Sequence, residues 1–260
     1  MRRRVALAAA LAAAVALASC GGGSGGGGSK PPPKGPPSAR HPASALAAEL
    51  TGEEMRAHLF VATRLYINLK YAFSATHIAA AQQEYSSLTG LVRQHDSVLD
   101  REFHAAFPVI AGQIAQRAPW LVVTNRMGMV QGQLLEAAIH DSMGNAAFND
   151  PGVTAYVMGR LASQGAREYS LAATVGGFSD RGRRAYQDAF GLLTRASSLS
   201  HNIGNFLGPQ RNAVVNGLND AHSNGFPTGV LVPRVLHPAA VNAGVQRALA
   251  AVQTRFGFAP

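Results

Sequence analysis

Apolar residues recur at spacings of three and four through most of residues 44–256. This period is typical of amphipathic helices that pack along one another. Thr51 and Glu54 have the spacing of a capping box, which predicts that the first long helix begins at Thr51. The stripe that follows predicts one helix to about residue 80, and its members are Met55, Leu59, Ala62, Tyr66, Leu69, Phe73, Thr76 and Ala80.

A second stripe predicts a further helix, with Gly90 as a candidate break before it. Its members are Leu88, Val92, Leu99, Phe103 and Ala106. We expect this helix to end at Pro108, because proline disfavours helical geometry in the residue that precedes it.

Pro119 can occupy the first turn of a helix that runs to about residue 147. Within this helix Gly128 and Gly132 lie four residues apart on one face. We expect the two glycines to allow close packing of a neighbouring helix inside the bundle, since the polar residues around them argue against a membrane span.

Capping signals divide the rest of the chain. Asp150 precedes a proline and predicts a helix to about residue 175, and Ser179 can cap the next one. Pro209 and Pro238 open the last two predicted helices. The helix after Ser179 has an apolar face made of Tyr186, Phe190, Leu193 and Ala196.

Residues 230–236 alone have the composition of a strand, and Pro233 interrupts them. One short extended segment does not make a sheet. The sequence therefore predicts an all-α fold, an antiparallel multi-helix bundle of about six to eight helices that forms a single domain over residues 44–260, long enough to bury a substantial core.

The first residues have the pattern of an export signal. Arg2, Arg3 and Arg4 precede an apolar run over residues 5–18, and small residues follow before Cys20. This order predicts a secretory signal peptide over residues 1–19 that is cleaved from the mature protein. The apolar run is shorter than the roughly 18 residues that a membrane-spanning helix needs.

The sequence Leu17-Ala18-Ser19-Cys20 resembles the lipobox of bacterial lipoproteins, and Cys20 is the single cysteine of the chain. The resemblance implies a diacylglyceryl group on the Cys20 sulfur, cleavage before Cys20 and acylation, for example with palmitate, of the new amino terminus. It also implies an extracytoplasmic protein held at the membrane by this lipid. Gly21 is not the aspartate that retains many lipoproteins in the inner membrane, so we expect the outer membrane in a Gram-negative cell and the outer face of the plasma membrane otherwise.

Glycine, serine and proline dominate the residues after Cys20. Glycine and serine give a flexible chain, and consecutive prolines favour an extended spacer. Such a composition cannot bury enough apolar surface to fold. We therefore expect residues 20–43 to be a disordered, lipid-anchored linker.

The net charge of the whole chain overstates that of the predicted domain. The chain has 23 Lys and Arg residues against 14 Asp and Glu residues. Six of the basic residues precede residue 44, which leaves 17 against 14 in the domain: they are Arg2, Arg3, Arg4, Lys30, Lys34 and Arg40. A surface that binds nucleic acid has a clustered basic face with interleaved aromatic residues, so no nucleic-acid partner is expected.

Three acid–histidine pairs have a spacing of four residues: Glu54 with His58, Asp100 with His104, and Glu136 with His140. Both members of each pair project from one helix face. Carboxylate and imidazole groups bind zinc, iron or manganese, and helical bundles build such sites from facing helices. Met143 continues the Glu136 stripe and would suit copper. In the alternative interpretation each pair only stabilises an exposed helix.

No motif for nucleophilic catalysis or phosphate binding is present in the sequence. The first hypothesis is therefore a lipid-anchored helical module of the bacterial cell envelope that has no catalytic residue or cofactor and binds an envelope protein, a polymer or a small ligand. The alternative is a metal-binding or metal-dependent bundle that uses the acid–histidine pairs to hold zinc, iron or copper.

Overall fold

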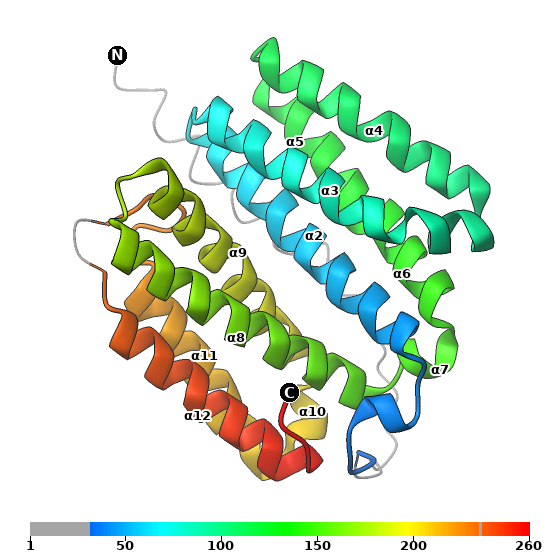
Figure 1. The fold of residues 1–260 in the computed structure, drawn as a ribbon, viewed down its shortest axis with the longest axis vertical. Coiled ribbons are helices and arrows are strands. Elements are labelled where there is room, and N and C mark those ends of the chain that lie inside the picture. Colours follow the sequence, from blue (N-terminus) through cyan, green and yellow to red (C-terminus); the bar gives the residue numbers. More distant parts are fainter. Residues whose placement is uncertain (1–31, 234–235) are drawn as a thin grey trace. The chain divides into compact units, whose positions relative to one another are not determined.

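The computed structural model describes residues 32–233 and 236–260 (Figure 1). The predicted signal peptide, Cys20 and the glycine-rich part of the linker lie outside these residues. The described residues confirm the predicted all-α, antiparallel bundle, and they contain no strand, including at residues 230–233 and 236 of the segment with a strand-like composition.

The predicted helix to residue 80 is in fact a hairpin of two helices, α2 (Ala43–Ile67) and α3 (Tyr71–His95). The chain reverses at Leu69, whose φ is 59°. At this turn Lys70 N–H donates to Leu65 O, and Leu69 N–H donates to Tyr66 O. These two hydrogen bonds form a Schellman motif, which ends a helix. The apolar stripe continues across the turn, so its period did not reveal the break.

Thr51 is not a helix cap. It lies within α2, which begins eight residues earlier and buries Ala45, Leu46 and Ala48 in its first turns. Burial of these apolar residues stabilises the additional helical turns that precede the capping box. The prediction of a helix start at Thr51 was therefore wrong.

Pro108 does not end its helix either. Asp96 accepts hydrogen bonds from Val98 N–H and Leu99 N–H and caps α4 (Ser97–Ala115), which continues through Pro108. Proline removes one backbone hydrogen bond, to the carbonyl of residue 104. Pro108 and His104 both lie on the exposed side of α4, where solvent can reach that carbonyl. The interruption is therefore tolerated.

The predicted helix over residues 119–147 is divided into α5 (Trp120–Met129), a π-helical turn η3 (Val130–Leu134), α6 (Leu135–Met143) and α7 (Asn145–Phe148). Gly144, at φ 74°, separates α6 from α7. Gly128 and Gly132 do not support close helix packing, because a Cβ atom at either position would meet no other atom within 4 Å. The residues are exposed, and that prediction was wrong.

The next two helices agree with their capping signals. Asp150 accepts from Gly152 N–H and caps α8 (Pro151–Val175), and Ser179 accepts from Gly182 N–H and caps α9 (Asp180–Asn202). The predicted apolar face of α9 is buried at all four positions: Tyr186, Phe190, Leu193 and Ala196.

The chain then passes through α10 (Gly204–Leu207) and a 3-10 turn η4 (Gly208–Gln210) to α11 (Arg211–Gly225). The last helix is α12 (Pro238–Phe256), which begins at the predicted proline. Helices α11 and α12 pack closely where Gly217 faces Gly244.

The boundary predicted for the linker needs a correction. A short 3-10 turn, η2 (Pro37–Ala39), follows the first described residues, and Pro37 is buried. Gly35 N–H donates to Phe256 O, and the side chains of Arg40 and His41 bind the Asp150 carboxylate. Composition alone predicted disorder to residue 43, but residues 35–41 gain specific contacts with α8 and α12 that composition does not reveal.

Four long helices form the centre of the described unit. Helix α2 packs between α3 and the α8–α9 hairpin, and α4, α5 and α6 cover the other side of α2 and α3 (Figure 1). Large buried side chains fill this region, among them Met55, Leu59, Tyr85, Tyr169 and Tyr186. No helix in the described part of the chain is both long and apolar enough to cross a membrane.

Candidate metal centre

The three predicted acid–histidine pairs do not meet at one point. Asp100 and His104 remain 3.5 Å apart on α4, and Asp100 is buried. Burial alone would raise the pKa of Asp100, but hydrogen bonds from Thr89, Tyr85 and Arg93 lower it below its ordinary value. Asp100 therefore joins α3 to α4 through three donors.

The pair on α6 is also occupied by other partners. Glu136 accepts a hydrogen bond from Arg56, and His140 lies 3.3 Å from Asp141 and 2.8 Å from Asn145. Hydrogen bonds with Asp141 and Asn145 raise the pKa of His140. This pair therefore forms contacts around α6 and the start of α7.

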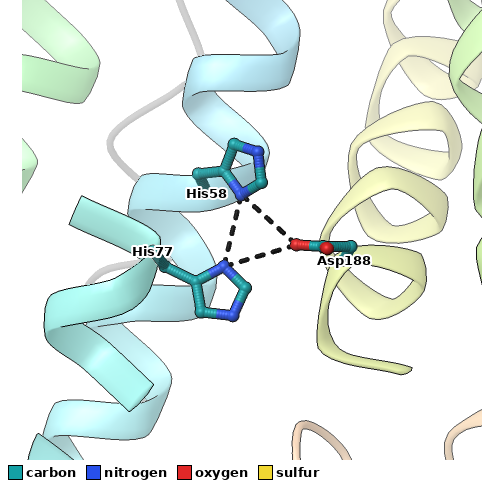
Figure 2. A group of neighbouring side chains, drawn as sticks. All are labelled: His58, His77 and Asp188. Atoms are coloured by element: carbon teal, nitrogen blue, oxygen red, sulfur yellow. Dashed lines mark hydrogen bonds and ion pairs between the residues drawn. The ribbon is translucent and has the colours of Figure 1, made fainter. Parts of the chain in front are cut away.

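The third pair, Glu54 and His58, leads to a different cluster. Among the described residues, one group of three metal-binding side chains has ligand atoms within 4.8 Å of one another, and it consists of His58, His77 and Asp188. They come from α2, α3 and α9 and point toward one another (Figure 2).

The three ligand atoms form a nearly equilateral triangle. The Nδ1 atoms of His58 and His77 are 3.2 Å apart, and Asp188 Oδ1 lies 3.5 Å from each of them. A point equidistant from the three atoms lies about 2.0 Å from each, which is the length of a zinc–imidazole or zinc–carboxylate bond. The triangle therefore has the dimensions of one face of a metal coordination shell.

The Gln187 amide determines which nitrogen of His77 carries the proton. His77 Nε2 lies 3.2 Å from Gln187 Oε1, and this oxygen can only accept a hydrogen bond. Nε2 of neutral His77 is therefore the donor, which leaves a lone pair on Nδ1, the atom that faces His58 and Asp188. Metal-binding histidines are commonly oriented by such a second hydrogen bond.

Asp188 Oδ1 is buried and accepts no hydrogen bond from the described residues. The two Nδ1 atoms lie 3.5 Å away, beyond ordinary hydrogen-bond length, and form no hydrogen bond with it. The other carboxylate oxygen, Oδ2, lies 4.0 Å from Arg184 Nε, one helical turn earlier on α9. A buried acceptor without a donor costs free energy, and a cation between the three ligand atoms would remove that cost.

The protonation states also suit a metal ion. Burial, and then the charge of Arg184, lower the pKa of His58 to about 4. Burial, and then His58, lower the pKa of His77 to about 3. Burial raises the pKa of Asp188 to about 7, against the opposing charge of Arg184. Both imidazoles are therefore neutral at neutral pH, which is the form that binds a metal.

A cavity of about 250 Å³ borders the cluster. His58 and Asp188 form part of its wall, together with Glu54, Glu84, Glu168 and Arg184. Burial, and then the charge of Glu84, raise the pKa of Glu54 to about 7. The predicted partner of His58 thus faces the same cavity, and three helices besides α2 contribute acidic side chains to it.

Sequence reasoning found His58 but missed His77, Asp188 and Gln187. The signal for His77 was its position: it lies four and eight residues before Ala81 and Tyr85, which are both buried on α3. A histidine in register with core residues must be paired or bound. Gln187 and Asp188 follow Tyr186 on α9, but the spacing along one helix does not show which helix they face.

Comparisons with models of known protein families, with curated proteins and with solved structures found no match for this chain.

Proposed function

We propose that this chain is a lipid-anchored metal-binding protein of the bacterial cell envelope, in which His58, His77 and Asp188 hold one divalent transition-metal ion. The observation that carries the proposal is the triangle of ligand atoms, with edges of 3.2, 3.5 and 3.5 Å, around a point about 2.0 Å from each. This ligand set differs from the one that the acid–histidine spacing predicted.

The donor set favours zinc(II) or iron(II). Two imidazoles and one carboxylate are the ligands of many zinc sites with an open position and of mononuclear iron(II) sites. No thiolate or thioether belongs to the cluster, which argues against a site for copper(I). Three protein ligands leave at least one coordination position free, and the adjoining cavity gives a small ligand a way to reach it.

A helical module that binds its partner without a metal remains the other proposal for the same anchored protein. The placement of Asp188 Oδ1 favours the metal, because this buried oxygen accepts no hydrogen bond from the described residues and lies 3.5 Å from the Nδ1 atoms of both His58 and His77. The two proposals differ in what they predict for variants of buried residues.

The test uses the untagged chain from Gly21, which keeps the whole described unit. Titration calorimetry with zinc(II), and with iron(II) under exclusion of oxygen, should show binding of one ion per chain. His77→Ala and Asp188→Asn each remove one ligand and should weaken binding at least about 100-fold, and Gln187→Leu should weaken it by about 10- to 100-fold.

His104→Ala is the matched control, because His104 lies on α4 outside the cluster and is exposed. It should change the affinity by less than about twofold. Circular dichroism of each variant would show that the helical fold is retained. The proposal is wrong if the parent chain binds neither ion, or if His104→Ala weakens binding as much as His77→Ala.

A further inference from the structure

Large apolar side chains are exposed at two turns of the bundle. In the α2–α3 turn Ile67 is 48% exposed and Leu69 is 69% exposed. At the start of α5 Trp120, Leu121 and Val122 are each between 47% and 49% exposed. Single exposed apolar residues are common, but neighbouring ones mark a surface that contacts something other than water.

The two turns are adjacent. Tyr66, at the end of α2, donates its hydroxyl hydrogen to the carbonyl of Ala118, in the α4–α5 turn. From the same turn, the Arg117 guanidinium lies 5.5 Å from the centre of the Tyr71 ring, at the start of α3. We call this end of the bundle the apolar cap and define it by Ile67, Leu69, Trp120, Leu121 and Val122.

Both turns hold a bulky residue where glycine is the favoured choice. Leu69 has φ 59° and Arg117 has φ 51°, and they are the only non-glycine residues with positive φ in the described part of the chain. Each occupies the C′ position of a Schellman motif, in which Ala118 N–H donates to Gln113 O and Arg117 N–H donates to Ile114 O at the second turn. Glycine adopts positive φ at a lower conformational free energy than other residues. The geometry of the turns therefore does not explain why leucine and arginine occupy these two exposed positions.

The charged residues on the two segments that build the apolar cap are all basic. Lys70 and Arg117 are exposed beside it. The segments that build it contain no acidic residue, since none lies between Glu54 and Glu84 or between Glu102 and Glu136. A second copy of the chain would bring these like charges together, which disfavours a dimer through this face.

We propose that the apolar cap binds an anionic lipid surface, with Trp120, Leu69 and Leu121 in the headgroup region and Lys70 and Arg117 beside lipid phosphates. Tryptophan has an apolar ring and a polar N–H group, which suits the membrane interface. Basic residues beside an apolar surface add attraction to anionic lipids. The proposal is independent of the metal centre, which lies between α2, α3 and α9.

The test uses the unlipidated chain from Gly21 and vesicles of phosphatidylglycerol and phosphatidylcholine, with phosphatidylcholine vesicles for comparison. Trp120 is the single tryptophan of the chain, so its fluorescence reports on this face alone. Binding should shift its emission to shorter wavelength with the anionic vesicles and sediment the chain with them, and salt should weaken both effects.

Leu69→Ser, followed by sedimentation, should reduce the binding constant at least about fivefold, and Lys70→Gln and Arg117→Gln should each reduce it about fivefold. The matched controls lie at the start of α4, at the opposite end of α3 from the apolar cap, where Val98 is 53% exposed and Arg101 is exposed. Val98→Ser and Arg101→Gln should change binding by less than about twofold.

Three results would overturn the proposal. The first is no sedimentation and no shift in Trp120 emission with anionic vesicles. The second is an equal loss of binding in Val98→Ser and Leu69→Ser. The third is sedimentation velocity that shows a dimer which Leu69→Ser dissociates, because the cap would then bind a second copy of the chain.

Discussion

Asp188 is the residue on which the metal proposal depends most closely. Its Oδ1 atom is buried without a donor and faces two imidazole nitrogens, and burial raises its pKa to about 7. The empty site therefore holds a proton on Asp188 in mildly acidic solution. A metal ion binds the ionised carboxylate, so the ion and this proton compete for the same group.

This competition predicts how metal affinity depends on pH. Above about pH 7 Asp188 is ionised in the empty site and affinity should be nearly constant. Below about pH 7 each ion displaces one proton, so affinity should fall about tenfold per pH unit until His58, with a pKa of about 4, also takes up a proton. Calorimetry in buffers of different ionisation enthalpy counts the protons released.

Glu54 has a similar pKa of about 7 and needs a control of its own. It lines the cavity but is outside the cluster of three ligand atoms. Glu54→Gln should therefore keep the fall in affinity below about pH 7, whereas Asp188→Asn should remove most of both the affinity and the proton release. If Glu54→Gln alone removed the pH dependence, the competing proton would be on Glu54 and not on Asp188.

At the scale of whole elements, the sequence located helices best where a cap side chain marks the start. Asp150 and Ser179 accept hydrogen bonds from the first turns of α8 and α9, as their positions predicted. The turn at Leu69 was missed because it has neither glycine nor proline, and the apolar period continues through it. Packing against the rest of the bundle offsets the cost of this turn, and such packing is not visible in a local pattern.

Glycines show the same limit. Gly128 and Gly132 have the spacing of a close helix contact but face open space, whereas Gly217 and Gly244 lie on different helices and form such a contact. A Cβ atom at Gly244 would lie 2.6 Å from the carbonyl oxygen of Gly217 and 2.8 Å from the Ala221 nitrogen. The neighbours are backbone atoms, so they cannot move aside without a shift of α11 against α12.

We therefore expect Gly244→Ala to lower the free energy of unfolding by about 1–3 kcal/mol, because the added methyl group overpacks the helix contact. Gly128→Ala is the matched control on an exposed helix and should raise that free energy by about 0.5–1 kcal/mol through better helix propensity. Urea unfolding followed by circular dichroism measures both. A loss of stability in both variants would contradict the contrast between the two sites.

For the whole molecule, the lipid on Cys20 and the apolar cap are two separate proposed contacts with a membrane. The described chain begins beside α8 and α12, near the start of α2, whereas the cap lies at the end of α2. The 25 residues of α2 span about 37 Å. Twelve residue steps separate Cys20 from Pro32, and any chain of that length spans at most about 40 Å, which is no shorter than α2, so an anchor at Cys20 is compatible with contact between the cap and the same surface.

The final prediction separates the two contacts in cells. The Cys20 thiol is the proposed point of lipid attachment, so Cys20→Ala should abolish the incorporation of labelled palmitate and prevent cleavage before residue 20. The parent chain should stay in the membrane fraction after a high-salt wash, because salt screens charges but does not extract a lipid. Ser24→Ala, in the linker, should behave like the parent. If Cys20→Ala is still cleaved, labelled and retained through the wash, Cys20 does not carry the anchor; if the parent itself is washed off by salt, the cap alone holds it to the membrane.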